Sequence, residues 1–180
     1  MRRAVTIALA LIALGASGVG ANQLAPAPTD GPTHWREIAW PFPRDGWPAG
    51  RAFRCDGACE GVELYIRAKL GFCNCDRGVA DDDEVDQVTD IDLISPRFVA
   101  MAPGEEARVG ELRGRTRPYD LDMPDGARRA ATGIALSRRC DLLVAVVQGA
   151  GEVVAVKHAA LEFLETQEMK RWITAALDGR

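Results

Sequence analysis

The stretch VELYIRAKLGFCNC, residues 62–75, constrains the fold most, because apolar residues recur at every second position along most of its length. Such alternation with a period of two is typical of a half-buried β-strand. The apolar face is formed by Val62, Leu64, Ile66, Ala68, Leu70 and Phe72. The other, more polar face carries Glu63, Tyr65, Arg67, Lys69, Cys73 and Cys75. We therefore predict a long strand that ends with both cysteines of a CxC pair on one side.

Three later segments also have strand character. Residues 108–122 (RVGELRGRTRPYDLD) and 130–136 predict two strands, separated by the turn sequence Pro-Asp-Gly at 124–126. The segment 139–147 (RCDLLVAVV) becomes continuously apolar, which is typical of a central strand covered on both faces. These segments predict a sheet in the middle of the chain.

Helical signals flank this sheet. Asp81 is a predicted N-cap with Glu84 placed for a capping box, and Thr166 is the predicted cap of a last helix. Apolar residues within 153–164 recur at helical spacing, although segment 152–157 alone is compatible with a strand or a helix. A strand-rich middle followed by terminal helices predicts an α+β fold: a largely antiparallel sheet with helices packed on it, two of them C-terminal.

The N-terminus is typical of an exported protein. Residues 1–21 combine the positive start MRR, an apolar run of about a dozen residues and a small-residue cleavage site, which predicts a signal peptide. The run is shorter than the roughly 20 residues that span a bilayer. Residues 22–33 predict a flexible linker, and residues 34–180 a single α+β domain. We expect a periplasmic or secreted protein that does not span the membrane after cleavage.

The charge argues against nucleic-acid binding. The formal net charge of −4 becomes −6 on cleavage, because the signal peptide contains two arginines and no acidic residue. Proteins that bind nucleic acid usually present a basic surface that neutralises phosphate. We therefore expect no nucleic-acid partner, whereas an envelope protein partner stays open.

Residues 34–50 (HWREIAWPFPRDGWPAG) predict an extended arm, because proline removes backbone donors and prevents a regular helix. Its Trp35, Trp40 and Trp47 can pack across the sheet, or form a docking strip for a partner. A second possible partner surface is the alternating row Arg113, Arg115 and Arg117, whose side chains point the same way. We expect carboxylates to pair with this row, and the alternative is an anion or an acidic partner.

Five cysteines in an oxidising compartment predict disulfides, with one thiol left free or paired between chains. The simplest arrangement joins Cys55 to Cys59, and Cys140 to Cys73 or Cys75. The alternative is a zinc or copper site built from Cys55, Cys59, Cys73 and Cys75, or a redox role for the CxC. A continuous strand over residues 62–75 would separate its ends by roughly 40 Å, which disfavours one shared site.

Few residues offer other catalytic chemistry. Beyond the signal peptide the only histidines and serines are His34, His158, Ser95 and Ser137, and neither serine lies in a GxSxG motif. The acidic cluster at residues 81–84 lacks the spacing of an EF-hand and is explained by the helix dipole. Paired-carboxylate hydrolysis stays open, but no pair is singled out, so we expect a protein without enzymatic activity.

Several segments together resemble a group of small exported proteobacterial proteins with no assigned function. They are WPFPRDGWPAGRAFRC with its C-x3-C, VELYIRAKLGFCNC, RCDLLVAVV and LEFLETQEMKRWITAAL. The resemblance implies that the pattern C-x3-C, GFCNC and RCD is a family feature, and it supplies no activity. The strand followed by closing helices is also similar in pattern to the PsbP/Mog1-like α/β/α sandwich, an alternative fold.

The sequence thus predicts an exported, disulfide-stabilised periplasmic domain, a binding or accessory protein of the cell envelope without a cofactor. The alternative is a periplasmic thiol protein that carries zinc, copper or redox equivalents through the CxC.

Overall fold

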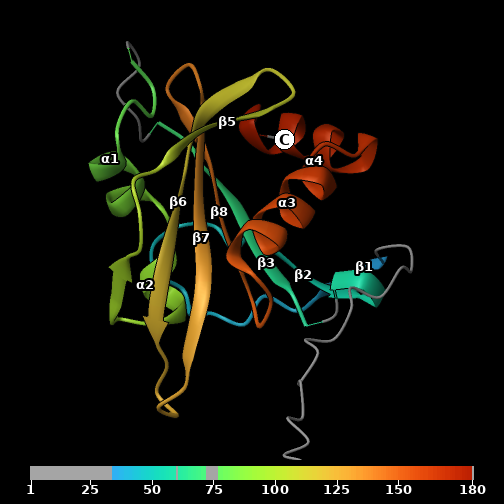
Figure 1. Ribbon diagram of the computed structural model, residues 1–180. Helices are drawn as coiled ribbons and strands as arrows, with labels where there is room; N and C mark the ends of the chain where they lie inside the picture. Colours follow the sequence, from blue (N-terminus) through green and yellow to red (C-terminus); the bar gives the residue numbers. More distant parts are fainter. Residues whose placement is uncertain (1–33, 60, 72–76, 180) are drawn as a thin grey trace, which may run out of the picture.

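The computed structural model describes residues 34–59, 61–71 and 77–179, so the predicted signal peptide and linker lie outside it. The described residues form one antiparallel sheet of eight strands with helices on both faces (Figure 1). The strands are β1 (His34–Ile38), β2 (Arg51–Asp56), β3 (Glu63–Lys69), β4 (Phe98–Ala100), β5 (Glu105–Val109), β6 (Leu112–Asp122), β7 (Arg128–Arg138) and β8 (Asp141–Gly149). The helices are η1 (Gly57–Cys59, a 3₁₀ turn), α1 (Asp82–Val88), α2 (Ile91–Ile94), α3 (Val153–Leu164) and α4 (Gln167–Leu177). The predicted α+β class is confirmed.

The strands follow the order β1-β2-β3-β8-β7-β6-β4, and β5 also pairs with β6. The strand predicted to be central, β8, lies between β3 and β7. Leu143 and Val147 of β8 belong to the core on one side of the sheet, whereas Leu142 and Val144 belong to the core on the other. Both faces of β8 are therefore buried, which is why its sequence does not alternate.

The segment 108–122, predicted as one strand, is a hairpin of β5 and β6. Gly110 has a φ of +55°, a backbone conformation that glycine adopts at little cost, and it reverses the chain between the two strands. The strand predicted at 130–136 is longer at both ends, since β7 pairs with β6 from Arg128 to Ser137.

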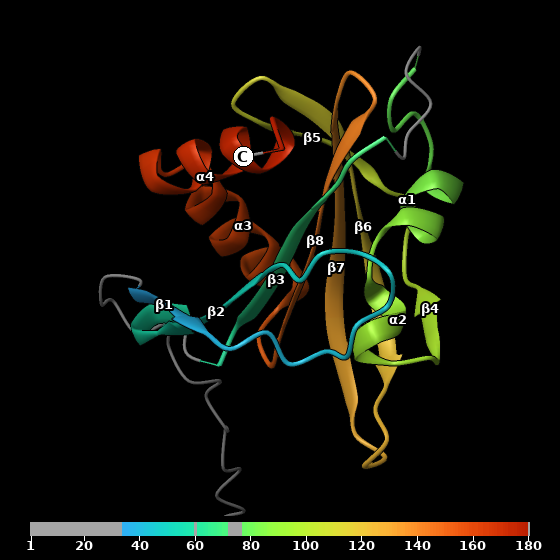
Figure 2. The ribbon, with the colours of Figure 1, turned by 180° about the vertical axis from the view of Figure 1, so that it is seen from behind.

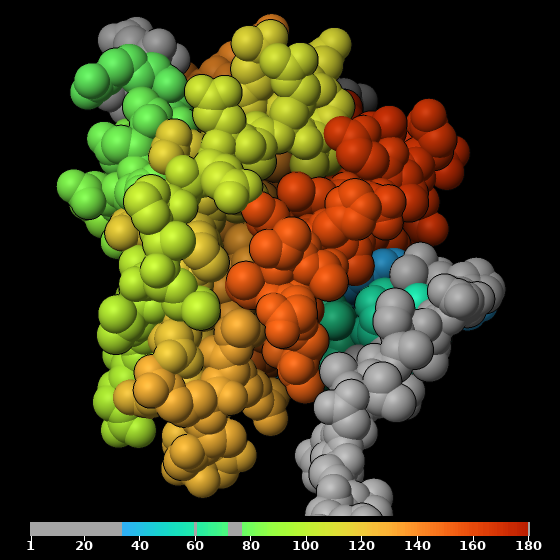
Figure 3. Space-filling view, in the orientation of Figure 1, coloured from blue at the N-terminus to red at the C-terminus, as the bar shows by residue number. Residues whose placement is uncertain are grey.

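The larger core lies between the sheet and the two C-terminal helices. The inner residues recur every fourth position: Val156, Ala160 and Leu164 on α3, then Met169, Ile173 and Leu177 on α4. The segment 152–157, which the sequence left open, begins α3, and Thr166 caps α4 as predicted. Figure 3 shows both helices (orange to red) closing over this face and lying against the yellow residues of the β5–β6 hairpin. Lys157 of α3 fixes this contact with an ion pair to Glu105 of β5.

The opposite face is covered by α1, α2 and the arm (Figure 2). Val85 and Val88 of α1 are buried against the sheet, as predicted. The arm, residues 39–50, runs across β3 on this face, and the rings of Trp40 and Phe42 pack on Tyr65.

The prediction of a half-buried strand ending in the CxC needs two corrections. The strand β3 ends at Lys69, and Cys73 and Cys75 lie outside the described residues. Its polar face is also buried: Tyr65, Arg67 and Lys69 are only 6%, 3% and 5% exposed. The physical reason is the arm, which covers these side chains.

Candidate functional site: the arginine ladder

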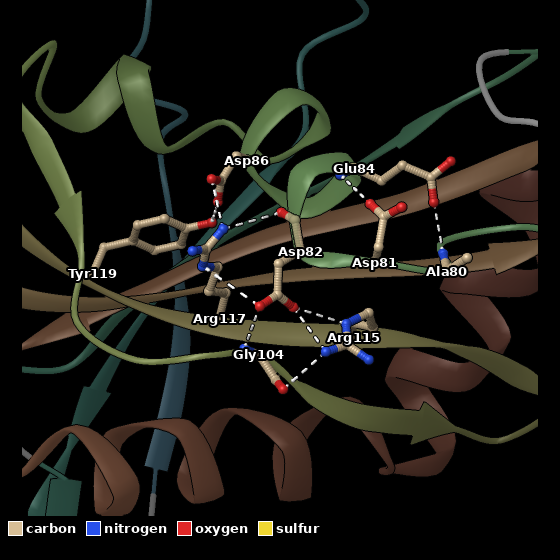
Figure 4. Close-up of polar contacts among 9 residues, drawn as sticks. All are labelled: Ala80, Asp81, Asp82, Glu84, Asp86, Gly104, Arg115, Arg117 and Tyr119. Atoms are coloured by element: carbon tan, nitrogen blue, oxygen red, sulfur yellow. Dashed lines mark hydrogen bonds and ion pairs between the residues drawn. The ribbon is translucent and has the colours of Figure 1, made fainter.

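Two of the three alternating arginines of β6 are paired with carboxylates of α1 (Figure 4). Arg115 donates from Nε and Nη2 to Asp82 Oδ1, at 3.0 and 2.8 Å. Arg117 donates from Nη1 to Asp86 Oδ2 at 2.6 Å. The predicted pairing of this row with carboxylates is confirmed for Arg115 and Arg117.

The spacing of the two elements explains this match. Asp82 and Asp86 are one helical turn apart, a rise of about 6.0 Å, and alternate residues of an antiparallel strand are about 6.8 Å apart. One helix can therefore offer a carboxylate to each of two successive arginines. We call the row Arg113, Arg115 and Arg117 the arginine ladder and each of these arginines a rung. The carboxylates of α1 pair with two rungs, Arg115 and Arg117.

The start of α1 is fixed by its own acidic residues. Asp81 accepts a hydrogen bond from the Glu84 N–H at 2.9 Å, as predicted for an N-cap. Glu84 Oε2 accepts from the N–H of Ala80 at 2.6 Å, one residue before the position that a capping box would use. The N–H groups of Ala80 and Glu84 are thereby satisfied within the helix start.

Neighbouring groups hold both helix carboxylates in place. Asp82 Oδ2 accepts from the Gly104 N–H at 2.8 Å, and this bond together with Arg115 lowers the pKa of Asp82. The Tyr119 hydroxyl donates to Asp86 Oδ1 at 2.5 Å. Burial and the Asp86 carboxylate raise the pKa of Tyr119, which therefore stays a hydrogen-bond donor.

The remaining rung, Arg113, has a different environment. Arg108 of β5 lies directly opposite Arg113 in the strand register. Arg77, which precedes α1, lies near them at the same pocket. Among the described residues, no carboxylate forms an ion pair with Arg77, Arg108 or Arg113, and all three side chains are exposed. Like charges directly opposite one another in a sheet are destabilising.

These arginines border a surface pocket of about 480 Å³, which we call the arginine pocket. Its lining residues come from β5, β6, β7 and the segment before α1: Arg77, Val79, Ala80, Glu106, Ala107, Arg108, Arg113, Gly114, Arg115 and Ser137. One helical turn before Asp82 the chain has Gly78 and therefore no carboxylate. Gly78 lies close to Ser137, the β7 residue opposite Arg113. Within residues 34–59, 61–71 and 77–179, no carboxylate pairs with Arg113 at this position.

The cysteines predicted to pair locally do so. Cys55 and Cys59 form a disulfide across the η1 turn, with Cα atoms 5.6 Å apart. Cys140 is also disulfide-bonded, and its predicted partners Cys73 and Cys75 lie outside the described residues. In residues 34–59, 61–71 and 77–179, no group of three or more His, Cys, Asp or Glu side chains is placed to hold a metal ion. The alternative metal site would need Cys55 and Cys59 in their reduced form.

The three tryptophans predicted for the arm contact the domain itself, Trp35 from β1 and Trp40 and Trp47 from residues 39–50. The Trp35 ring stacks on Phe163 of α3, with centroids 4.8 Å apart. Trp40 packs on Tyr65, and Lys69 Nζ lies 5.7 Å from the centre of the Trp47 ring. These contacts agree with the packing interpretation, and a partner for the same rings stays a prediction.

A buried cluster of charges, which was not predicted from the sequence, lies under the arm. Arg67 donates to both carboxylate oxygens of Asp90 and to both of Asp45. Lys69 Nζ lies 2.9 Å from Asp90 Oδ1. The available signal was an aspartate, Asp45, in an arm otherwise rich in aromatic and proline residues.

The fold and the ladder together define an α+β sheet domain with an arginine-lined surface pocket. No protein-family model and no curated protein matches the chain. Among solved structures it is similar to a Pseudomonas aeruginosa protein of unknown function, with 14% identity, a TM-score of 0.38, and coverage of 79% of this chain and 86% of that one. A likeness of this degree assigns neither family nor function. None of the described helices is long and apolar enough to cross a membrane.

Proposed function

We propose that this chain is an exported, non-catalytic binding domain of the cell envelope, and that the arginine pocket holds an anionic ligand. The observation that carries the proposal is the pair Arg108 and Arg113, which face one another across two strands without a carboxylate partner in the described chain. An anion bound between such guanidinium groups removes their repulsion and accepts charge-assisted hydrogen bonds.

Export is supported by two features. Residues 1–21 have the pattern of a signal peptide. The Cys55–Cys59 disulfide fits an oxidising compartment such as the periplasm, where disulfides persist.

The chemistry of the pocket favours binding over catalysis. Guanidinium groups stay charged at any physiological pH and do not transfer protons readily. The hydroxyl in the lining, Ser137 Oγ, donates to the Arg113 carbonyl at 3.2 Å, and no imidazole is among the lining residues. Of the two histidines outside the signal peptide, His34 lies on β1 and His158 on α3.

Isothermal titration of the exported chain with citrate and with sulfate tests this proposal. We expect binding at low salt that weakens at least about tenfold in Arg108→Gln and Arg113→Gln, because a charge-assisted hydrogen bond contributes roughly 1.5–3 kcal/mol. Arg44→Gln is the matched control, since this exposed arginine of the arm lines none of the pockets found near the ladder. An equal loss in the Arg44 variant, or a folded chain that binds neither these anions nor an acidic peptide, would contradict the proposal.

A further inference from the structure

We infer that the ligand of the arginine pocket is an acidic extended segment of a partner protein, bound through two carboxylates beside the edge of β5. This inference rests on the proposed function and specifies the chemistry of its ligand. It follows from four observations: the counter-ions that the ladder already has, the charge of the pocket, the backbone groups around it and the outer edge of β5.

The ladder already has carboxylate counter-ions. Asp82 and Asp86 of α1 fit Arg115 and Arg117 because a helical turn and two strand residues have nearly the same length. One helical turn before Asp82 lies Gly78, which is close to Ser137, the residue opposite Arg113 in the strand register. A carboxylate entering from another molecule would complete the series at the same spacing.

The charge of the pocket favours two carboxylates over one. Arg77, Arg108 and Arg113 contribute three positive charges, and Glu106 contributes one negative charge. Arg115 also lines the pocket, but Asp82 already neutralises it. Counted over the described lining residues and without the Arg115–Asp82 pair, the net charge is about +2, which matches a pair of acidic side chains.

The backbone around the pocket does not favour phosphate. Phosphate sites at helix starts usually present free N–H groups to the anion. Here the N–H groups of Ala80, Glu84 and Gly104 already donate to carboxylates of α1 or its cap. These three N–H groups are therefore not free for an anion, whereas the guanidinium groups have planar donors that fit a carboxylate in a bidentate manner.

A partner segment also has room for its main chain. In the described part of the sheet, β5 pairs only with β6, so no second strand occupies its outer edge beside Arg108. Free strand edges are common docking places for extended or irregular segments of other proteins. A free dicarboxylate would use the arginines but not this edge.

The test is fluorescence anisotropy with three labelled peptides that differ at two alternate positions, whose side chains lie on the same side of an extended segment. These positions carry Glu and Glu, Glu and Gln, or Gln and Gln. We expect the exported chain to bind the first peptide at least about tenfold more tightly than the other two. Arg108→Gln and Arg113→Gln should remove this preference, whereas Arg44→Gln should retain it.

Charge reversal gives a readout that loss of folding does not imitate. The double variant Arg108→Glu and Arg113→Glu, which changes the net charge of the pocket from about +2 to about −2, should abolish binding of the Glu/Glu peptide and bind a Lys/Lys peptide instead. If citrate or inorganic phosphate binds and the Glu/Glu peptide does not, the peptide inference is wrong while the proposed function stands. If neither these anions nor the peptide binds to a folded chain, both are wrong.

Discussion

Arg67 and Asp90 form a bidentate ion pair inside the protein, with Arg67 Nε and Nη2 at 2.7 and 2.6 Å from the two carboxylate oxygens. Their side chains are only 3% and 9% exposed. Asp45 of the arm binds the same guanidinium group, and Lys69 approaches Asp90. Two positive and two negative charges therefore balance one another and fasten the arm and the α1–α2 junction to β3.

We predict that Asp90→Ala destabilises the protein strongly, because the change leaves Arg67 and Lys69 buried with too little negative charge. Breaking one partner of a buried ion pair typically costs about 3–5 kcal/mol. Urea denaturation of the purified protein measures this loss. Asp92→Ala, at an exposed position of α2, is the control and should change the stability by less than about 0.5 kcal/mol. Equal effects of the two changes would refute a structural role for the cluster.

The Asp45 carboxyl predicts a pH dependence of stability. Its hydrogen bonds with Arg67 lower its pKa from 3.8 to about 2. A carboxyl with a depressed pKa in the folded state stabilises the fold above its unfolded pKa, and this contribution is lost as the pH falls. The stability difference between the natural chain and Asp45→Asn should therefore shrink as the pH falls from about 4 to about 2. Urea midpoints across this range measure it, and a constant difference would contradict the prediction.

We expect Gly50→Ala to loosen the arm where it joins β2. A methyl group there would meet Trp40 Cζ3 at 2.7 Å and Arg67 Cβ at 2.8 Å, both closer than real contacts allow. Overpacking of this kind costs about 1–3 kcal/mol. Thermal or urea unfolding should show this loss, with little change in Ala49→Ser at the exposed neighbouring position. Unchanged stability would mean that the arm moves aside freely.

The cysteines predict one free thiol per chain. Cys55 and Cys59 are joined, and Cys140 is also disulfide-bonded. If the partner of Cys140 belongs to the same chain, four of the five cysteines are bonded and one is reduced. Maleimide labelling of the denatured, non-reduced protein, followed by mass measurement, counts it. Four or five labelled thiols with zinc or copper in the native mass would favour the thiol-carrier alternative instead.

Much of the fold could be predicted because its strands and helices carry local signals. These signals depend only on neighbours in the sequence. They are the continuous apolar run of β8, the caps at Asp81 and Thr166, and the apolar residues at every fourth position of α4. The burial of Arg67 and Lys69 could not be predicted in this way. It depends on an arm and an aspartate, Asp90, that lie more than 20 residues away from Arg67 in the chain.

The candidate site was predicted in part. The alternation of Arg113, Arg115 and Arg117 showed that these side chains share a face, and pairing with carboxylates was expected for all of them. The sequence does not show that α1 supplies carboxylates to Arg115 and Arg117 but none to Arg113. Nor does the sequence place Arg77 and Arg108 beside Arg113. The register of the β5–β6 hairpin brings Arg108 there, and the path of the chain before α1 brings Arg77.

The position of α1 on the ladder has a consequence for selectivity. Three uncovered arginines in a row would attract any polyanion, including the anionic lipids and polysaccharides of an envelope. By occupying two of them with Asp82 and Asp86, the helix reduces the valence of this surface to what Arg113 and its two neighbours provide. Asp82 and Asp86 thus compete with any external anion for these two arginines. On the proposed function, the site that remains favours an anion whose charge and spacing match it.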